Sequence, residues 1–222
     1  MEVELAGNGK RETANGQPEL VVPYLAPTQR LVSLPPIGLR DAVTGAAPRL
    51  RTAVRVGLRN GALLVRFDGR DAGTLATLGG RDDPLWTEDV YEVFVTPFDP
   101  PTVYFEFEIN PLGAVFDARV TSPDLVRATM KADVGWNLPG LCGRSRVRPE
   151  RWSATFQIPI APMLEGSTVP GDRRAWRANF FRVDRGAGTG ADEYSAWSPT
   201  GSSPADFHEA RRFGRLELPD LP

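Results

Sequence analysis

Two tryptophans stand in segments whose residue types could bind a ligand. Trp86 precedes Glu92 by six residues within Leu85–Glu92, and Trp197 lies within Tyr194–Pro199. An indole on a loop offers a broad apolar face to a flat ligand or to the C–H face of a sugar ring. A carboxylate such as Glu92 can accept two hydrogen bonds from hydroxyl groups. The pattern predicts a stacking site with a polar partner, and the alternative for both tryptophans is packing beneath a loop.

Three predicted strands, 90–95, 103–109 and 114–120, would position the polar groups of such a site. Side chains alternate across a strand, so each strand has one apolar face and one second face. If the strands are antiparallel neighbours, the second faces combine into one polar patch. Its members would be Glu92, Glu106, Glu108, Asn110, Asp117 and Arg119. We expect Glu92 to bind ligand hydroxyls, with edge contacts from Asn110, Arg119 and Asn179. A solvated outer sheet face is the alternative for the others.

The remaining pattern is that of an all-β protein. The 22 glycines and 21 prolines separate short runs rich in Val, Phe, Trp and Leu, which favours an antiparallel β-sandwich. Segments 50–58 and 62–67 flank Asn60-Gly61, a pair suited to a two-residue hairpin turn. Further strands are predicted at 152–160, 175–183 and 213–218, loops at 140–148 and 186–193, and one short helical turn at 161–164. Residues 1–40 are predicted to be an extended lead-in, and residues 41–222 to form one domain.

Alternation also predicts which large side chains are buried. Trp152 and Trp176 share a face with apolar neighbours and are expected in the core, and Trp136 is expected to pack in a loop. Arg182 falls on the apolar side of its strand, where pairing with a carboxylate is its expected role.

Composition excludes several functional classes. The net charge of −2 and pI of about 5.6 give no basic surface for nucleic acid, and no apolar run is long enough to span a membrane. Cys142 is the single cysteine, so an intramolecular disulfide is excluded. The segment Met1–Pro18 lacks the apolar core of a secretory signal. We therefore expect a cytoplasmic protein unless a leader was removed.

Catalytic motifs are missing from the sequence. His208 is the single histidine, and the chain has no Gly-x-Ser-x-Gly, phosphate-loop, His-Glu-x-x-His or Cys-x-x-Cys motif. Glu106 and Glu108 share a strand face and could in principle hydrolyse a glycosidic bond, but no feature of the sequence marks either for a raised pKa. The expectation is a protein that is not an enzyme.

Seven segments in order carry a family resemblance: LWTEDVYEVFV, YFEFEINPLGAVFD, WSATFQIPI, WRANFFR, SAWSPT, FH and RRFGRLEL. From about Leu50 to Leu218 the chain resembles the family 9 carbohydrate-binding modules of the DOMON-like superfamily. The resemblance implies a jelly-roll or immunoglobulin-like sandwich that binds a saccharide or polysaccharide without cleaving it. It places Trp86 and Trp197 in an aromatic clamp and Glu92 at the sugar. It also implies that a carbohydrate-active enzyme could be a partner.

The resemblance bears on cofactors as well. Relatives often hold structural calcium, and the acidic stretches Asp68–Asp71, Asp82-Asp83 and Glu88-Asp89 offer oxygen ligands. No cofactor is required for the expected function.

Two other functions remain open at this point. One is a haem-binding electron-transfer domain of the DOMON type, in which His208 with Met130 or Met163 would ligate the iron. The other is a sandwich whose exposed aromatic residues bind other protein subunits.

Overall fold

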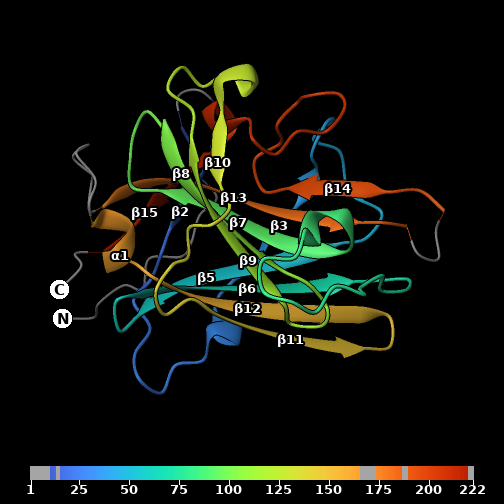
Figure 1. Ribbon diagram of the computed structural model, residues 1–222. Helices are drawn as coiled ribbons and strands as arrows, with labels where there is room; N and C mark the ends of the chain where they lie inside the picture. Colours follow the sequence, from blue (N-terminus) through green and yellow to red (C-terminus); the bar gives the residue numbers. More distant parts are fainter. Residues whose placement is uncertain (1–10, 14–15, 166–173, 187–189, 220–222) are drawn as a thin grey trace.

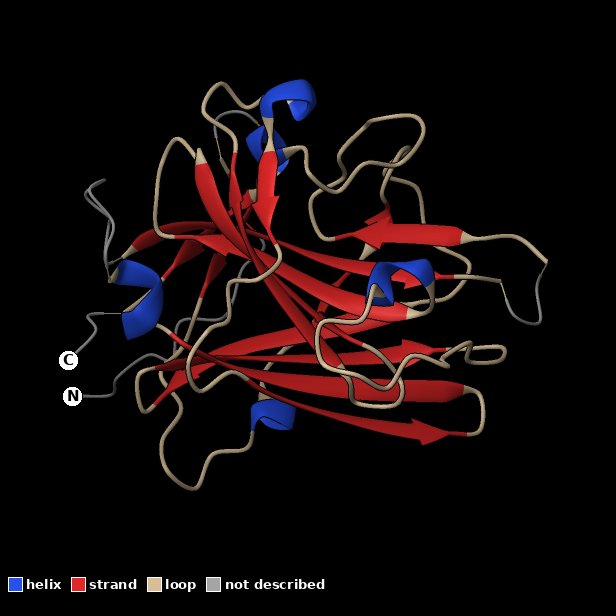
Figure 2. Cartoon of the chain, in the orientation of Figure 1, coloured by secondary structure: helices blue, strands red, loops and turns tan. Residues whose placement is uncertain are grey.

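Two β-sheets packed face to face build the protein, and helical turns are confined to the connections (Figures 1 and 2). The computed structural model describes residues 11–13, 16–165, 174–186 and 190–219. The predicted antiparallel β-sandwich is confirmed. No helix within the described ranges is long and apolar enough to cross a membrane.

The elements follow one another in a nearly all-β order. The strands are β1 (Arg11–Glu12), β2 (Pro18–Val21), β3 (Ile37–Gly38), β4 (Arg40–Asp41), β5 (Thr52–Arg59), β6 (Ala62–Arg70), β7 (Val90–Thr96), β8 (Val103–Ile109), β9 (Val115–Thr121), β10 (Lys131–Asp133), β11 (Cys142–Arg148), β12 (Arg151–Pro159), β13 (Ala175–Asp184), β14 (Glu193–Ala196) and β15 (Gly214–Glu217). The helical elements are α1 (Ala161–Leu164) and the 3-10 turns Leu31–Ser33, Leu85–Thr87, Arg127–Thr129 and Ala210–Arg212.

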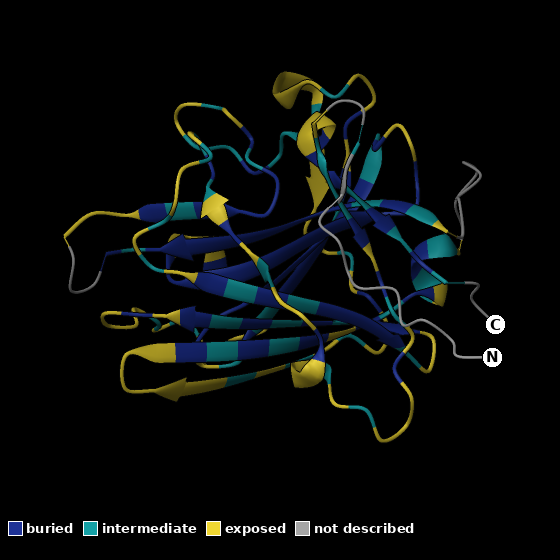
Figure 3. Ribbon diagram, turned by 180° about the vertical axis from the view of Figure 1, so that it is seen from behind, coloured by how far each residue is buried: buried dark blue, intermediate teal, exposed yellow. Residues whose placement is uncertain are grey.

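The smaller sheet has the strand order β11-β12-β6-β5-β3. Its β5–β6 hairpin turns at Asn60 and Gly61, whose φ angles of 50° and 70° are those of the predicted two-residue turn. The loop predicted at 140–148 is wrong, because residues 142–148 form the edge strand β11. This strand is rich in arginine and mostly exposed (Figure 3), so it lacks the apolar alternation that marks a half-buried strand.

The larger sheet has the strand order β1-β2-β15-β13-β7-β8-β9-β10, and β14 pairs with both β13 and β4. β15 and β2 are parallel, whereas the pairs from β13 through β10 are antiparallel. Strands β2, β3 and β4, which lie mostly within the predicted lead-in, take places in the two sheets.

The core between the sheets is built on aromatic stacking. Tyr91 stacks on Trp152 with ring centroids 3.7 Å apart, and Phe67 stacks on the same tyrosine at 4.7 Å. Trp152 and Trp176 are fully buried, which confirms both predictions. Arg182 is buried between Asp71 and Asp184, with nitrogen–oxygen distances of 3.1 and 2.6 Å, and this confirms the pairing expected for it.

The outer face of the larger sheet carries a second hydrophobic cluster. Strand residues Phe94, Tyr104 and Phe181 pack there against Leu85 and Phe207, which come from connecting segments. All seven residues of β7 are buried as a result. The expectation of a solvated outer face is therefore wrong for this sheet, because the connections fold over it.

Candidate functional site

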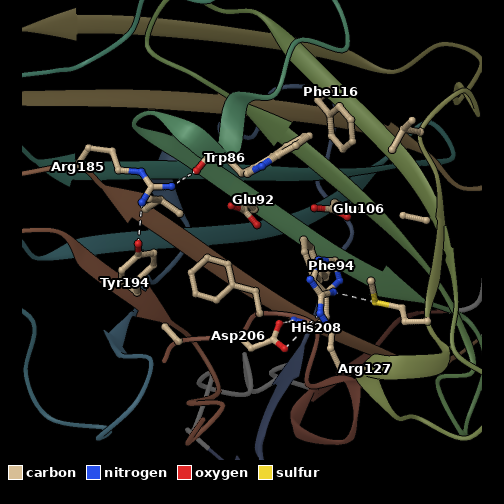
Figure 4. Close-up of a pocket in the computed structure, with 16 residues that line it drawn as sticks. Trp86, Glu92, Phe94, Glu106, Phe116, Arg127, Arg185, Tyr194, Asp206 and His208 are labelled. Atoms are coloured by element: carbon tan, nitrogen blue, oxygen red, sulfur yellow. Dashed lines mark hydrogen bonds and ion pairs between the residues drawn. The ribbon is translucent and has the colours of Figure 1, made fainter. Parts of the chain in front are cut away.

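A cavity of about 380 Å³ lies on the covered outer face of the larger sheet. Strands β7 and β8 contribute Glu92 and Glu106, and the turn before β7 contributes Trp86 (Figure 4). Arg127 and Arg185 come from segments more distant in the sequence. The cavity thus brings an indole, two guanidinium groups and three carboxylates, the third from Asp206, into one space.

Trp86 forms part of the cavity wall and is 42% exposed. Its ring and that of Phe116 pack in a T-shaped arrangement, with centroids 5.2 Å apart and an interplanar angle of 71°. The Arg185 guanidinium donates to the backbone oxygen of Trp86. These contacts hold the turn while leaving an indole face available to a ligand.

Arg185 contacts both Trp86 and Tyr194 in the wall of the cavity. Its guanidinium donates to the Tyr194 hydroxyl at 2.7 Å and lies 5.6 Å from the centre of that ring. It also pairs with Asp192 at 3.0 Å. Because the guanidinium is planar and has five donors, one arginine can fix both Trp86 and Tyr194.

Three buried glutamates lie together beneath Trp86. Glu92 and Glu108 stand directly opposite each other on β7 and β8, and Glu106 is opposite Phe94. One carboxylate oxygen from each of the three lies within 4.8 Å of the others. Glu92 and Glu106 line the cavity, whereas Glu108 lies behind them with no exposed surface.

Burial decides the protonation of these glutamates. It raises the pKa of Glu106 to about 7, and burial together with neighbouring carboxylate charge raises the pKa of Glu92 and Glu108 well above the usual range. Arg185 opposes the rise for Glu92, and Arg127 opposes it for Glu106. Near neutral pH the three carboxyl groups are therefore partly protonated, and they share both the protons and the remaining negative charge.

His208 lies at another side of the cavity, where Tyr104 contacts it. The Tyr104 hydroxyl is 2.8 Å from His208 Nδ1 and 3.3 Å from the sulfur of Met130. Burial and the charge of Arg127 lower the pKa of His208 to about 4, so the imidazole is neutral at pH 7. The haem alternative therefore has His208 and Met130 in one cavity, where Tyr104 contacts the Met130 sulfur and Nδ1 of His208. Met163 is buried between the sheets.

The structure brings Trp86 and Glu92 together in the cavity, as the family resemblance implied. It does not bring Trp197 there. Trp197 is 7% exposed and packs on Phe180 in the core between the sheets, with ring centroids 5.3 Å apart. Ala196 at the end of β14 faces the outer cluster, so the next residue points to the inner side. The predicted clamp of two tryptophans is therefore wrong.

Asn110 and Asn179 are fully buried, and their side-chain amides form hydrogen bonds with backbone groups. The Asn110 amide donates to the Leu78 oxygen at 2.6 Å and accepts from the Ala114 nitrogen at 3.0 Å. Asn179 donates to the Ser198 oxygen at 2.8 Å. Neither lines the cavity, so the expected edge contacts of these two residues are not formed there.

Arg119 and Asp117 lie on the opposite face of the sheet from the glutamates. Pairing of β8 with β9 sets Arg119 opposite Phe105 and Asp117 opposite Phe107. The polar patch expected from these strands is wrong for both residues, because the register aligns Phe116, not Asp117, with Glu108.

Several members of the cavity are not identified by the sequence patterns. Glu106 falls in the predicted polar patch, for which a solvated sheet face is the alternative, and no pattern gives a role to Arg127, Arg185, Tyr194 or Asp206. The run of glutamates in Tyr-Phe-Glu-Phe-Glu was a usable signal, because it places two carboxylates on one face of a strand made of apolar residues. No local pattern identifies the arginines, which reach the cavity from connections.

The model of the family described as carbohydrate-binding family 9 matches residues 45–218, more than half of the chain. The chain belongs to carbohydrate-binding family 9. An extracellular protein from Arthroderma benhamiae is 24% identical over 192 residues, which cover 81% of this chain and 84% of that protein.

Solved structures share the family 9 fold. A candidate carbohydrate-binding protein from Bacteroides uniformis has a TM-score of 0.70 at 18% identity, with 90% of this chain and 99% of that chain covered. A family 9 module from Caldicellulosiruptor kristjanssonii, solved with cellotriose, has a TM-score of 0.62 at 11% identity, with 92% and 95% covered. The same organism's module solved with glucose has a TM-score of 0.58 at 11% identity, with 92% and 97% covered.

A second acidic group in this family 9 chain consists of Asp71, Asp89 and Asp184. Two of the stretches considered for calcium meet here. Arg182 pairs with Asp71 and Asp184, and Asp89 accepts from the backbone nitrogens of Leu75 and Arg185, each at 2.7 Å. Because an arginine and backbone donors already satisfy these carboxylates, the group fits a structural ion-pair network better than a calcium site.

Proposed function

We propose that the protein binds a saccharide, without cleaving it, in the cavity walled by Trp86. The observation that carries this proposal is a partly exposed indole directly beside buried carboxylates in one cavity. A pyranose ring has an apolar face that stacks on an aromatic ring and an edge of hydroxyl groups that need donors and acceptors. Trp86 offers the first contact, and Glu92 and Glu106 offer the second.

Membership of carbohydrate-binding family 9 supports this function, and the relatives suggest which ligands to test first. The modules from C. kristjanssonii were solved with cellotriose and with glucose. We therefore propose glucose and short glucose oligomers as the first ligands for this chain.

The proposed stacking differs from a clamp of two tryptophans. Trp86 is the main platform, and the half-buried ring of Tyr194 lines the same cavity. Arg127 and Arg185 would donate hydrogen bonds to ring-edge hydroxyls or to the glycosidic oxygen. This arrangement has fewer parallel aromatic surfaces than a clamp, so polar contacts carry more of the affinity.

The same carboxylates argue against hydrolysis. The structure raises the pKa of all three glutamates, which the sequence did not indicate. Glycoside hydrolysis uses two carboxyl groups whose environments hold one protonated and leave the other charged. Here burial acts on all three in the same direction. We therefore propose binding alone and no cofactor for it. A non-catalytic site of this kind would concentrate a carbohydrate-active enzyme, the proposed partner, on its substrate.

Isothermal titration calorimetry tests the proposal. We expect saturable binding of at least one saccharide from a panel that contains glucose, cellotriose and oligomers of other neutral and amino sugars. Trp86→Ala should weaken that binding about tenfold or more, equivalent to about 1.4 kcal/mol. The control is Trp136→Ala, because Trp136 packs on Phe105 and does not line the cavity. Equal affinity of wild type and Trp86→Ala, or no binding across the panel, would contradict the proposal.

A further inference from the structure

The outer face of the smaller sheet gathers positive charge. Strands β5, β6, β11 and β12 contain eight arginines, no lysine and a single acidic residue, Asp68. All eight arginines alternate with the core residues of their strands and so point outward, and together they form the arginine face. Its members are Arg55, Arg59, Arg66, Arg70, Arg144, Arg146, Arg148 and Arg151. These four strands carry a net charge of +7 within a chain whose net charge is −2, so whole-chain charge does not reveal the face.

Strand register sets several of these arginines directly opposite one another. Arg148, Arg151 and Arg70 form one row across the neighbouring strands β11, β12 and β6. Like charges that are directly opposite destabilise a sheet. All three positions in this row are exposed, where a neutral polar residue would fold equally well. A repulsive row at exposed positions therefore indicates a role in binding and not in folding.

Most guanidinium groups of the arginine face are free to bind an external anion. Asp68 pairs with Arg55 and Arg66, and Arg59 donates to backbone oxygens. The side chains of the other five arginines are exposed and form no ion pair or hydrogen bond with any described residue: Arg70, Arg144, Arg146, Arg148 and Arg151. Each free guanidinium has five donors in a planar fork, which suits an oxyanion.

We propose that the arginine face binds a linear acidic polysaccharide whose rings carry carboxylate or sulfate groups. Guanidinium groups would pair with the anions, and neighbouring hydroxyl side chains would bind the ring hydroxyls. Ser153 and Thr155 on β12 supply such side chains, because they lie opposite Arg146 and Arg144. In the described part of the chain β11 is the edge strand of this sheet, so a long ligand can extend past it (Figure 1).

Other anionic macromolecules fit the arginine face less well. The outward residues of these strands include no aromatic side chain, so the face lacks the stacking platform on which single-stranded nucleic acids bind. Val147 is the exposed large apolar residue of these strands, and it lies opposite Trp152, on the other side of the sheet. The face therefore lacks both the apolar centre of a protein interface and the inserted side chains of a membrane-surface element.

The arginine face is separate from the Trp86 cavity, because the two lie on different sheets. The inference thus goes beyond the proposed function. Trp86→Ala should leave binding of an acidic polysaccharide unchanged, and loss of the arginine face should leave binding of a neutral saccharide unchanged.

Calorimetric titration of the full chain at low ionic strength tests the inference. The probes are oligogalacturonate, which carries carboxylates, dextran sulfate, which carries sulfates, and neutral dextran. We expect saturable binding of at least one acidic polysaccharide and none of neutral dextran, and the tighter of the two acidic probes identifies the preferred anion. Added salt should weaken the binding.

Three substitutions in the exposed row supply the decisive variant. Arg70→Ser, Arg148→Ser and Arg151→Ser combined should lower the affinity about tenfold or more. The Tm should stay equal or rise, because a repulsive row is removed. The control changes the net charge equally with Arg40→Ser, Arg211→Ser and Arg212→Ser, which are exposed positions outside the arginine face, and should stay within about twofold of wild type.

Asp68→Asn should act in the opposite direction. It removes the single carboxylate of the four strands and releases Arg55 and Arg66, so the affinity for the acidic polysaccharide should rise about two- to threefold. A loss of binding cannot be confused with this gain.

Four results would overturn the inference. They are no saturable binding of either acidic polysaccharide, equal affinity of wild type and the variant of the exposed row, loss of binding in Trp86→Ala, and equal or tighter binding of poly-glutamate or duplex DNA. The last result would show that charge alone, or another class of polymer, is recognised. None of the four affects the binding of neutral saccharides in the Trp86 cavity, which is measured separately.

Discussion

The outer faces of the two sheets both carry like charges on directly opposite residues, but they balance these charges differently. On the smaller sheet Arg55 is opposite Arg66, and both donate to Asp68 at 2.5–3.0 Å in partly exposed positions. On the larger sheet Glu92 is opposite Glu108 in a buried position without a described basic partner. On the covered face burial and neighbouring carboxylates raise the pKa of both glutamates, so shared protons relieve the repulsion, whereas ion pairs with Asp68 relieve it on the open face. The comparison therefore assigns the saccharide site to the covered face and a structural role to the Asp68 ion pairs of the open one.

The largest expected effect comes from the difference in packing between the covered outer face of the larger sheet and the open outer face of the smaller sheet. Phe181→Ala should lower the free energy of unfolding by about 3–5 kcal/mol, because the buried ring stacks on Phe207 with centroids 4.1 Å apart and meets Phe94 at 5.1 Å. Chemical denaturation measures the change. Arg66→Ala on the open face is the control and should cost less than about 1 kcal/mol. Equal and small losses for both variants would show that the outer face of the larger sheet is not a packed layer.

The next effect concerns the pH dependence of stability. The pKa of Glu106 is about 7 in the folded protein and about 4.3 in an unfolded chain, so folding favours the protonated form. Its stabilising contribution is complete below about pH 4.3 and is lost as the pH rises through 7. Glu106→Gln should therefore gain about 1–3 kcal/mol relative to wild type between pH 4.5 and pH 8.

Other buried groups contribute to the absolute pH profile, so the difference between the two proteins is the quantity to measure. The raised pKa of Asp89, about 6, acts in the same direction, and the lowered pKa of His208, about 4, acts in the opposite direction. Both are present in wild type and variant. If the free energies of unfolding of wild type and Glu106→Gln changed with pH in parallel, folding would not raise the pKa of Glu106, and the prediction would be contradicted.

The smallest effect is expected on the open face. Asp68→Asn removes the carboxylate that balances Arg55 and Arg66 and should cost about 0.5–1 kcal/mol at low ionic strength. Because these side chains are partly exposed, added salt should reduce the loss. A loss above about 2 kcal/mol that salt does not change would mean that the two faces are more alike than the structure indicates.

Sequence patterns predicted the elements of this fold because the relevant physics is local. The Asn60-Gly61 turn depends on two residues that tolerate positive φ, and the burial of Trp152 and Trp176 follows from alternation along single strands. The sequence also predicted that Arg182 pairs with a carboxylate, because an arginine on an apolar strand face needs a partner of opposite charge.

The site was predictable only where its residues are close in sequence. Trp86 and Glu92 belong to one turn and strand, and they meet in the cavity. Trp197 and Arg119 were misplaced because strand register and the path of β14 depend on contacts across the sheet. The alternation of side chains along a strand shows which residues share a face, but it does not show whether connecting segments cover that face. The burial of Glu106 and Glu108 could not be deduced for that reason.

The central claim is that a saccharide binds against Trp86 on the covered face. The most direct test is a titration of isotope-labelled protein with cellotriose, or with the saccharide that calorimetry selects, observed through the indole N–H resonances of the five tryptophans. The account predicts a large, saturable shift for Trp86 and small shifts for Trp152, Trp176 and Trp197, which are buried between the sheets. A saturable shift of another tryptophan while Trp86 stays unchanged would contradict it.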